Sequence, residues 1–239
     1  MLEGPHLIEE ALLSGLAVEH VFCSASLLAD GSKAPFLGRL EQKRVPLVPV
    51  EDALLQEFAT TENTQGYLAI VAAPPCGWTV LSSRAPSSLI IADGIQDPGN
   101  LGSLARIAEG CGCGGLVTTR GTVDPANPKC LRASAGSLLR LPFVQGARSM
   151  EVIEWLRARS FEVVIAATQA GLEPWKADLR PPFALVVGNE SRGIGSDFKT
   201  AAGKLVTIPL QGKLESLNAA AAAGIILYEA LARSAADLT

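Results

Sequence analysis

The feature of this sequence that most restricts its fold is a series of short apolar runs separated by helix-like segments. Residues 88–94 (SLIIADG), 161–168 (FEVVIAAT) and 183–188 (FALVVG) are almost continuously apolar, without the alternation of a strand that faces water on one side. Strands of this kind need a helical layer on each face of their sheet. The sequence therefore predicts an α/β fold with a mostly parallel sheet and helices on both faces.

A segment rich in proline, serine and glycine separates two regions with such patterning. Helix and strand signals alternate on a smaller scale before it, which predicts a small α/β domain over residues 1–74. A linker is expected over residues 75–87, and the larger domain over residues 88–239. The last helix of that domain, expected over residues 217–233, has too few polar side chains for a surface position. It must be buried within the fold or against another subunit.

The composition disfavours several kinds of site. The chain has two histidines and five cysteines, without the spacing of a zinc site or of a disulfide framework, so we expect no metal and reduced thiols in a cytoplasmic protein. No apolar run reaches the roughly 20 residues of a membrane-spanning helix, and the N-terminus has no secretion signal. The glycine-rich residues 110–115 follow a helix and precede a strand, which is the wrong order for a dinucleotide-binding oxidoreductase.

Three loops after predicted strands are unusual, and ligands of parallel sheets bind beyond the carboxyl ends of the strands. The loops belong to residues 97–106 (DPGNLGSLAR), 185–195 (LVVGNESRGIG) and 208–224 (IPLQGKLESLNAAAAAG). Asn100 is expected to cap the helix that follows it. Gly188 is expected to lie where another group approaches closely. Either polar residue of the third loop, Ser216 or Asn218, could cap the last helix.

The charge distribution supports two interpretations. The formal net charge is −4, and most of the acidic excess lies in residues 1–74. One segment of the larger domain is locally basic, with a single aspartate, Asp124, among five cationic residues: Arg120, Lys129, Arg132, Arg140 and Arg148. A solvated face and a strip that contacts phosphate groups explain this segment about equally well.

In this order and spacing, the three loops resemble the SpoU (TrmH) family of RNA ribose 2′-O-methyltransferases. Residues 2–16 (LEGPHLIEEALLSGL) and 64–71 (TQGYLAIV) look like the family's accessory substrate-binding domain, with a fold similar to ribosomal protein L30e. The basic segment that usually starts this domain is missing, a pattern typical of a truncated chain or a misassigned start. The resemblance implies a C-terminal trefoil knot, S-adenosylmethionine as cofactor and a homodimer formed through the catalytic domain.

The resemblance also implies roles for individual residues. Arg106 matches the catalytic arginine, and the polar residues that support it are Asn100, Glu190, Ser216 and Asn218. The positions that match the cofactor site are Thr168, Gln169, Gly188, Ile208 and Leu217. The basic residues expected to contact RNA are Arg120, Lys129 and Arg132. Transfer of a methyl group needs positioning rather than a metal.

The expected substrate is structured RNA, and the two-domain layout favours ribosomal RNA over tRNA. The alternative is a non-catalytic RNA-binding or ribosome-assembly factor that has kept the fold. The presence of Arg106, Ser216 and Asn218 favours the enzyme.

Overall fold

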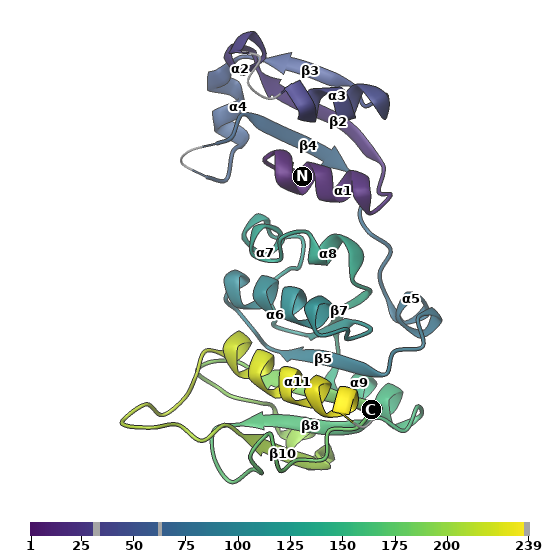
Figure 1. Ribbon diagram of the computed structural model, residues 1–239, viewed down its shortest axis with the longest axis vertical. Helices are drawn as coiled ribbons and strands as arrows, with labels where there is room; N and C mark the ends of the chain where they lie inside the picture. The colour runs from purple at the N-terminus through teal and green to yellow at the C-terminus, as the bar shows by residue number, and fades with distance from the viewer. Residues whose placement is uncertain (31–33, 62–63, 237–239) are drawn as a thin grey trace. The chain divides into compact units, whose positions relative to one another are not determined.

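The structure is a computed structural model that describes residues 1–30, 34–61 and 64–236 (Figure 1). It divides into two compact units, Met1–Pro74 and Pro75–Thr239. No helix in the described part of the chain combines the length and the hydrophobicity needed to cross a bilayer.

The first unit is a small α/β domain, as predicted. Its four strands have the order β1-β4-β2-β3, in which only β2 and β3 pair in parallel. Ile8 from the first helix and Tyr67 from the last strand are fully buried in its core. The elements are β1 (Leu2–Glu3), α1 (Pro5–Leu13), β2 (Val18–Ser24), α2 (Ala25–Asp30), α3 (Ala34–Gln42), β3 (Leu47–Val50), α4 (Asp52–Phe58) and β4 (Tyr67–Val71).

The second unit is built on a six-stranded sheet of order β10-β8-β9-β5-β6-β7. Every pair of neighbours is parallel, which confirms the predicted sheet. The strands are β5 (Ser88–Asp93), β6 (Leu116–Thr119), β7 (Phe143–Ala147), β8 (Glu162–Ala167), β9 (Phe183–Gly188) and β10 (Lys204–Thr207). The helices are α5 (Trp78–Ser83), α6 (Pro98–Gly110), α7 (Pro128–Ala133), α8 (Ser137–Arg140), α9 (Ser149–Arg157), α10 (Ser196–Ala201) and α11 (Ala219–Ala236).

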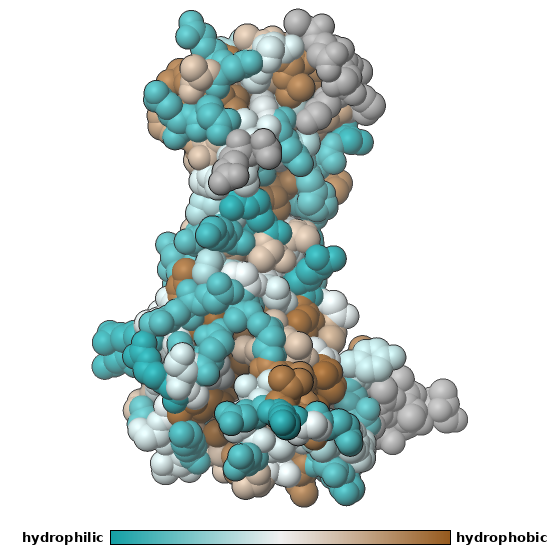
Figure 2. Space-filling view, turned by 90° about the vertical axis from the view of Figure 1, so that its left-hand side faces the viewer, coloured by the Kyte–Doolittle hydropathy of each residue, from teal (hydrophilic) through white to brown (hydrophobic). Residues whose placement is uncertain are grey.

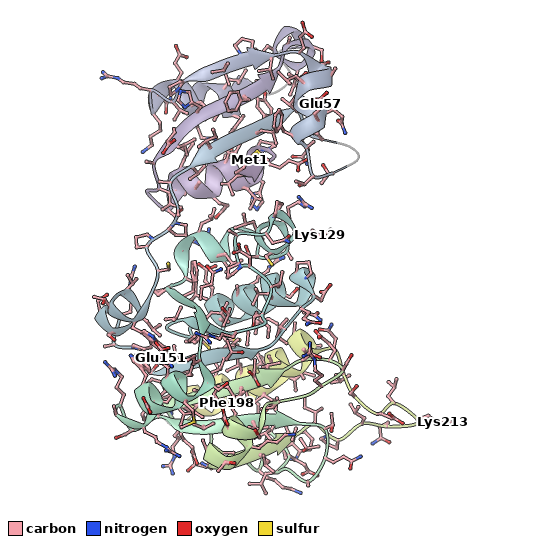
Figure 3. All side chains as sticks on the ribbon, turned by 180° about the vertical axis from the view of Figure 1, so that it is seen from behind. Met1, Glu57, Lys129, Glu151, Phe198 and Lys213 are labelled. Carbon is pink, nitrogen blue, oxygen red and sulfur yellow. The ribbon has the colours of Figure 1, made fainter. Side chains whose placement is uncertain are left out.

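Helices cover both faces of this sheet. On one face, α5, α9 and α10 bury Leu81, Leu156 and Phe198 against strand residues such as Ile91 and Val186. Figure 3 views the molecule from behind Figure 1 and labels Phe198 on this side. Helices α6, α7, α8 and α11 form the layer on the other face, where α6 packs on both α7 and α11. The apolar strands of the sequence are therefore buried on both sides.

The predicted linker, residues 75–87, is a part of the second unit and carries α5. Trp78 stacks on Trp155 with 5.2 Å between ring centroids, and Leu81 is fully buried. The surrounding proline, serine and glycine residues conceal this apolar pair, which has the i, i+3 spacing of one helix face. Only the composition suggested a linker.

The last helix, α11, has two different faces. It buries Ala223, Ile226 and Leu227 within the unit, as expected, but leaves Ile225, Tyr228 and Leu231 exposed by 44%, 69% and 45%. The exposed residues follow helical spacing and so form one stripe. Figure 2 shows one face of the molecule, on which hydrophilic residues are interspersed with hydrophobic groups, one of them in the lower half of the view.

Candidate active site

A cavity of about 550 Å³ opens at the carboxyl ends of three neighbouring strands, β10, β8 and β9. Its volume is in the range of small-molecule sites, which is about 300–1,000 Å³. Apolar side chains such as Ile165, Val187 and Ile226 form much of the wall. Polar groups from the loops after the strands complete it. Such a lining suits a ligand with an apolar part and a few polar groups.

Gly188 ends β9 at the cavity wall. A side chain at this position would collide with other atoms of the protein, even without a ligand in the cavity. A Cβ atom there would lie 2.5 Å from Cγ1 of Ile194 and 2.6 Å from the carbonyl carbon of Gly193. The loop folds back this closely because Asn189 and Gly193 exchange two backbone hydrogen bonds, of 3.1 and 2.8 Å. The close approach that the sequence predicted at Gly188 therefore comes from its own loop.

Two buried or half-buried polar side chains hold this loop against the neighbouring strand. Asp93, at the end of β5, accepts hydrogen bonds from the Gly195 backbone N–H and the Thr119 hydroxyl, both at 2.8 Å. Asn189 donates its side-chain N–H to the Gly94 carbonyl at 2.8 Å. Sequence reasoning missed both residues, although each follows directly on an apolar strand. Together they fix the position of the loop that forms one wall of the cavity.

Helix α6 begins one turn earlier than predicted. Its N-cap is Asp97, whose Oδ1 accepts the Asn100 backbone N–H at 2.7 Å, and Pro98 is the first helical residue. The prediction that Asn100 caps this helix is wrong. Proline is favoured at the first helical position because it has no N–H to satisfy there, and the aspartate before it is a good cap. As a result, the Asn100 side chain is free to make other contacts.

The Asn100 side chain joins the three loops. Its Nδ2 donates to Oε1 of Glu190 at 2.5 Å, and its Oδ1 accepts from Nδ2 of Asn218 at 2.6 Å. Asn218 also caps α11, because its Oδ1 accepts the backbone N–H groups of Ala220 and Ala221 at 3.0 and 3.2 Å. Of the two residues that could cap this helix, Asn218 does so, and Ser216 contributes to the cavity wall instead.

The residues assigned to the cofactor lie around one cavity. Those that line it are Thr168, Gln169, Gly188, Ile208 and Leu217, together with Glu190 and Ser216 from the catalytic set. Asn100 contacts the lining residue Glu190 directly, and Asn218 is connected to it through Asn100. Arg106 does not belong to the lining, and it lies exposed on α6. Within residues 1–30, 34–61 and 64–236 its guanidinium has no ion pair. The predicted catalytic role of Arg106 therefore requires a substrate that binds at the surface of α6, outside the cavity.

The cavity also has charged residues that the sequence did not suggest. Lys199, on α10, and Glu215, in the loop before α11, line it together with Glu190. The wall thus carries one cation and two carboxylates. Lys199 belongs to no recognisable motif. It reaches the cavity because α10 packs beside β8, and the sequence alone does not show that contact.

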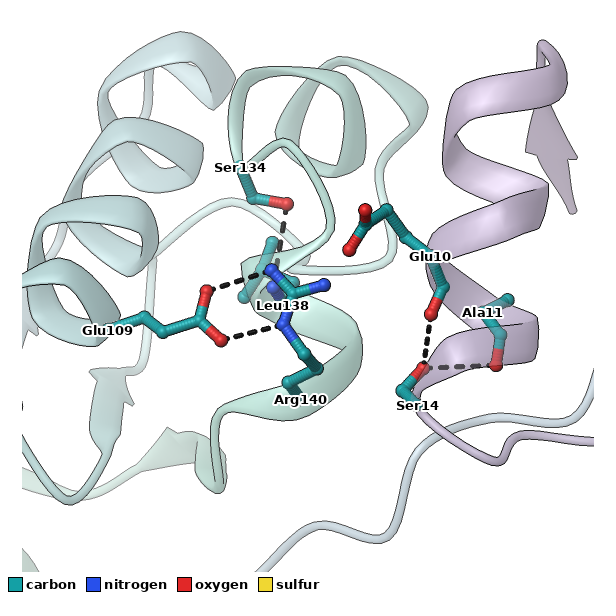
Figure 4. Close-up of polar contacts among 7 residues, drawn as sticks. All are labelled: Glu10, Ala11, Ser14, Glu109, Ser134, Leu138 and Arg140. Carbon is teal, nitrogen blue, oxygen red and sulfur yellow. Dashed lines mark hydrogen bonds and ion pairs between the residues drawn. The ribbon is translucent and has the colours of Figure 1, made fainter.

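The residues of the predicted basic strip differ in their surroundings. Arg140 is neutralised by Glu109 of α6, with Nε–Oε1 and Nη2–Oε2 distances of 2.6 and 2.9 Å (Figure 4). The sequence did not show this pair because the two residues lie 31 positions apart. Arg120 and Lys129 are exposed, and Arg132 is half-buried on α7.

Comparison with known proteins decides the family. The sequence profile of the SpoU rRNA Methylase family matches residues 87–228. The chain belongs to this family. A second profile, that of the MRM3-like substrate binding domain, matches residues 1–69. The family and the accessory domain that the motifs suggested are both confirmed.

Similar proteins match along nearly the whole chain. The 23S rRNA (uridine(2479)-2′-O)-methyltransferase of Streptomyces viridochromogenes is 31% identical over 95% of this chain and 83% of its own length. The 23S rRNA (guanosine(2553)-2′-O)-methyltransferase RlmP of Bacillus subtilis is 32% identical over 95% and 86%. Among solved structures, AviRb from Streptomyces viridochromogenes in complex with AdoMet has a TM-score of 0.87 and 28% identity, covering 98% of this chain and 89% of that one.

Proposed function

We propose that the protein methylates a ribose 2′-hydroxyl of ribosomal RNA, with its cofactor in the cavity at the ends of β8, β9 and β10. As a member of the SpoU family, the chain is an S-adenosylmethionine-dependent RNA 2′-O-methyltransferase. Two relatives of matching length are named as methyltransferases of 23S rRNA, which supports ribosomal RNA as the substrate. The observation that carries the assignment is the convergence of three distant loops on one cavity through Asn100, Glu190 and Asn218.

The cavity suits S-adenosylmethionine in shape and charge. Apolar residues such as Val187 and Ile226 offer a surface for an adenine ring, and backbone groups near Gly188, Ile208 and Leu217 offer polar contacts to its edge. The cofactor carries a sulfonium and an ammonium group, which the carboxylates of Glu190 and Glu215 complement. Its single carboxylate group is complemented by Lys199. Bound there, the cofactor supplies an electrophilic methyl group.

Arg106 is proposed to act on the RNA rather than on the cofactor. A guanidinium keeps its proton in proteins, so it is poorly suited to act as the base. It is well suited to bind the phosphate next to the target ribose and to stabilise negative charge that develops on the 2′-oxygen. The exposed position of Arg106 is what contact with an RNA backbone requires. Arg120, Lys129 and Arg132 are proposed to bind phosphates further along the RNA.

The exposed stripe on α11 supports the proposed homodimer. Ile225, Tyr228 and Leu231 project from a helix that is otherwise packed into the catalytic unit. A second copy with the same stripe would cover these residues in a two-fold contact. Sedimentation equilibrium tests this: Tyr228→Glu should yield monomers, and a parent protein that is already monomeric at micromolar concentration contradicts the dimer. The trefoil knot likewise stays a prediction.

The experiment that tests the function has two parts. Calorimetry should show binding of S-adenosylmethionine to the purified protein. Mapping of ribose methylation in RNA from cells with and without the gene should then reveal a gene-dependent site in ribosomal RNA. Binding of the cofactor without any gene-dependent methylation would favour the non-catalytic assembly factor.

A further inference from the structure

Two arginines lie side by side at the carboxyl edge of the sheet, on the far side of β5 from the cofactor cavity. Arg120 follows β6 directly, and Arg148 follows β7 directly. The backbone N–H of Arg120 donates to the carbonyl of Ala147 at 3.0 Å, which continues the parallel ladder of the two strands by one residue. Since neighbouring strands are about 4.8 Å apart, the two backbones are held close together.

Neither guanidinium is neutralised. Both side chains are exposed, and no ion pair of either one occurs among the described residues. Two acids of this region, Asp124 and Glu151, have other hydrogen-bond partners among the described residues. Asp124 accepts from the Ala126 backbone N–H at 2.8 Å and from the Gln145 amide at 3.2 Å, and Glu151 accepts from the indole of Trp78. Two cationic side chains on neighbouring backbones can both be attracted to one anion, which offsets their mutual repulsion.

The place of the pair relative to the cavity suggests which anion. In the sheet order, β6 lies two strands from β9 and β7 three strands, which is about 10 and 15 Å at the usual strand spacing. All parallel strands point the same way, so the pair and the cavity share one edge of the sheet. A polyanion with one reacting group at the cavity would therefore extend along this edge of the sheet. Arg120 and Arg148 would contact it a short distance from that group.

We propose that Arg120 and Arg148 together clamp one backbone phosphate of the RNA substrate, a few nucleotides from the ribose that is methylated. This proposal rests on the function proposed above and assigns Arg148, one of the five cationic residues of the basic segment, to the same phosphate as Arg120. Because the two guanidiniums contact phosphate rather than bases, they contribute affinity and orientation but no sequence preference. They lie too far from the cavity to affect cofactor binding.

The test is the salt dependence of RNA binding. The probe is an in vitro transcript of bacterial 23S ribosomal RNA, and the variants are Arg120→Gln, Arg148→Gln and the double variant. Each lost phosphate contact lowers the slope of log K against log salt concentration by about 0.7–0.9. If both guanidiniums hold one phosphate, the double variant should lower the slope by about 0.7–0.9 and weaken binding several-fold, and each single variant should have a smaller effect of the same sign. The Kd for S-adenosylmethionine should not change.

Arg157→Gln is the matched control, because Arg157 is an exposed arginine at the opposite end of α9 from Arg148. It should leave both the slope and the cofactor affinity unchanged. A double variant with the parent slope would overturn the clamp while leaving the methyltransferase assignment intact, provided that the parent protein binds and methylates RNA. A parent protein that neither binds nor methylates ribosomal RNA would overturn both.

Discussion

Asn100 and Glu190, which are 90 residues apart in the sequence, share a hydrogen bond of 2.5 Å at the edge of the cavity. The bond ties the N-terminal turn of α6 to the loop after β9. On its other side, Asn100 accepts a hydrogen bond from Asn218, the cap of α11. The Asn100 side chain thus holds the N-termini of α6 and α11 beside the cavity wall. Substitutions of these hydrogen-bonded side chains can distinguish effects on stability from effects on function.

Asn218 has two tasks that different substitutions distinguish. Asn218→Asp keeps an oxygen to accept the Ala220 and Ala221 N–H groups, but it cannot donate to Asn100. We expect nearly parental thermal stability and a large loss of methyl transfer. Asn218→Ala removes both contacts and should also lower the free energy of unfolding by about 1 kcal/mol. Equal activity of Asn218→Asp and the parent would contradict a functional role for the link.

Arg106→Lys tests the importance of the guanidinium. Lysine keeps the positive charge but loses the paired donors that match a phosphate group. We expect kcat to fall by about 10², with an unchanged Kd for S-adenosylmethionine. Arg157→Lys serves as the comparison and should have normal kcat. Near-normal turnover of a folded Arg106→Lys enzyme shows that the guanidinium is dispensable.

Gly188→Ala should damage the cavity without unfolding the sheet. The new methyl group would lie within 2.7 Å of the Gly193 backbone, so the loop must move outward. We expect the Kd for S-adenosylmethionine to rise at least tenfold, as measured by calorimetry. Gly110→Ala is the control: its Cβ atom meets nothing within 4 Å, and its position at the end of α6 favours alanine. Parental cofactor affinity in Gly188→Ala would show that the loop tolerates the displacement.

Lys199→Met tests the charge pattern of the cavity. If Lys199 pairs with the carboxylate of the cofactor, the parent protein should bind S-adenosylmethionine more tightly than its decarboxylated analogue. In Lys199→Met the two ligands should bind with similar affinity, because the partner of the carboxylate is gone. Lys176, which pairs with Glu173 outside the cavity, offers a matched control as Lys176→Met. Discrimination that persists in Lys199→Met would assign the carboxylate to another partner.

The pair of Glu109 and Arg140 should give a pH-dependent share of stability. The hydrogen bond from Arg140 lowers the pKa of Glu109 below its usual 4.5. Its stabilising effect is therefore full above pH 4.5 and is lost as the pH falls through the lowered pKa. Both side chains are about one-third exposed, so solvent screening limits the effect to roughly 0.5–1 kcal/mol. In urea unfolding, Arg140→Met should be less stable than the parent at pH 7, and the difference should shrink as the pH falls below 4.5.

The sequence predicted the parallel sheet correctly because strands buried on both faces are continuous apolar runs, as in residues 183–188. It also singled out three loops, after β5, β9 and β10, and the structure joins these loops through Asn100, Glu190 and Asn218. Helix α5 was missed because two apolar side chains among prolines and serines give little periodic signal. The true cap of α6 was missed because both Asp97 and Asn100 are good capping residues, and only the position of Pro98 separates them.

Long-range side-chain pairs were beyond sequence reasoning. Glu109 and Arg140 pair across two helices, and Lys199 reaches the cavity through the packing of α10. Neither spacing nor residue type reveals such contacts in a single sequence. The distinction matters for function, because the charge pattern of the cavity depends on such contacts, as Lys199 shows.

The hydrogen bonds that join Glu190, Asn100 and Asn218 need a residue close to the C-terminus, which has a consequence for biosynthesis. A nascent polypeptide that has emerged only through β9 already contains most of the sheet, but it lacks the partner that holds Asn100 in place. Premature termination before residue 218 should therefore yield fragments that fold in part and do not transfer methyl groups.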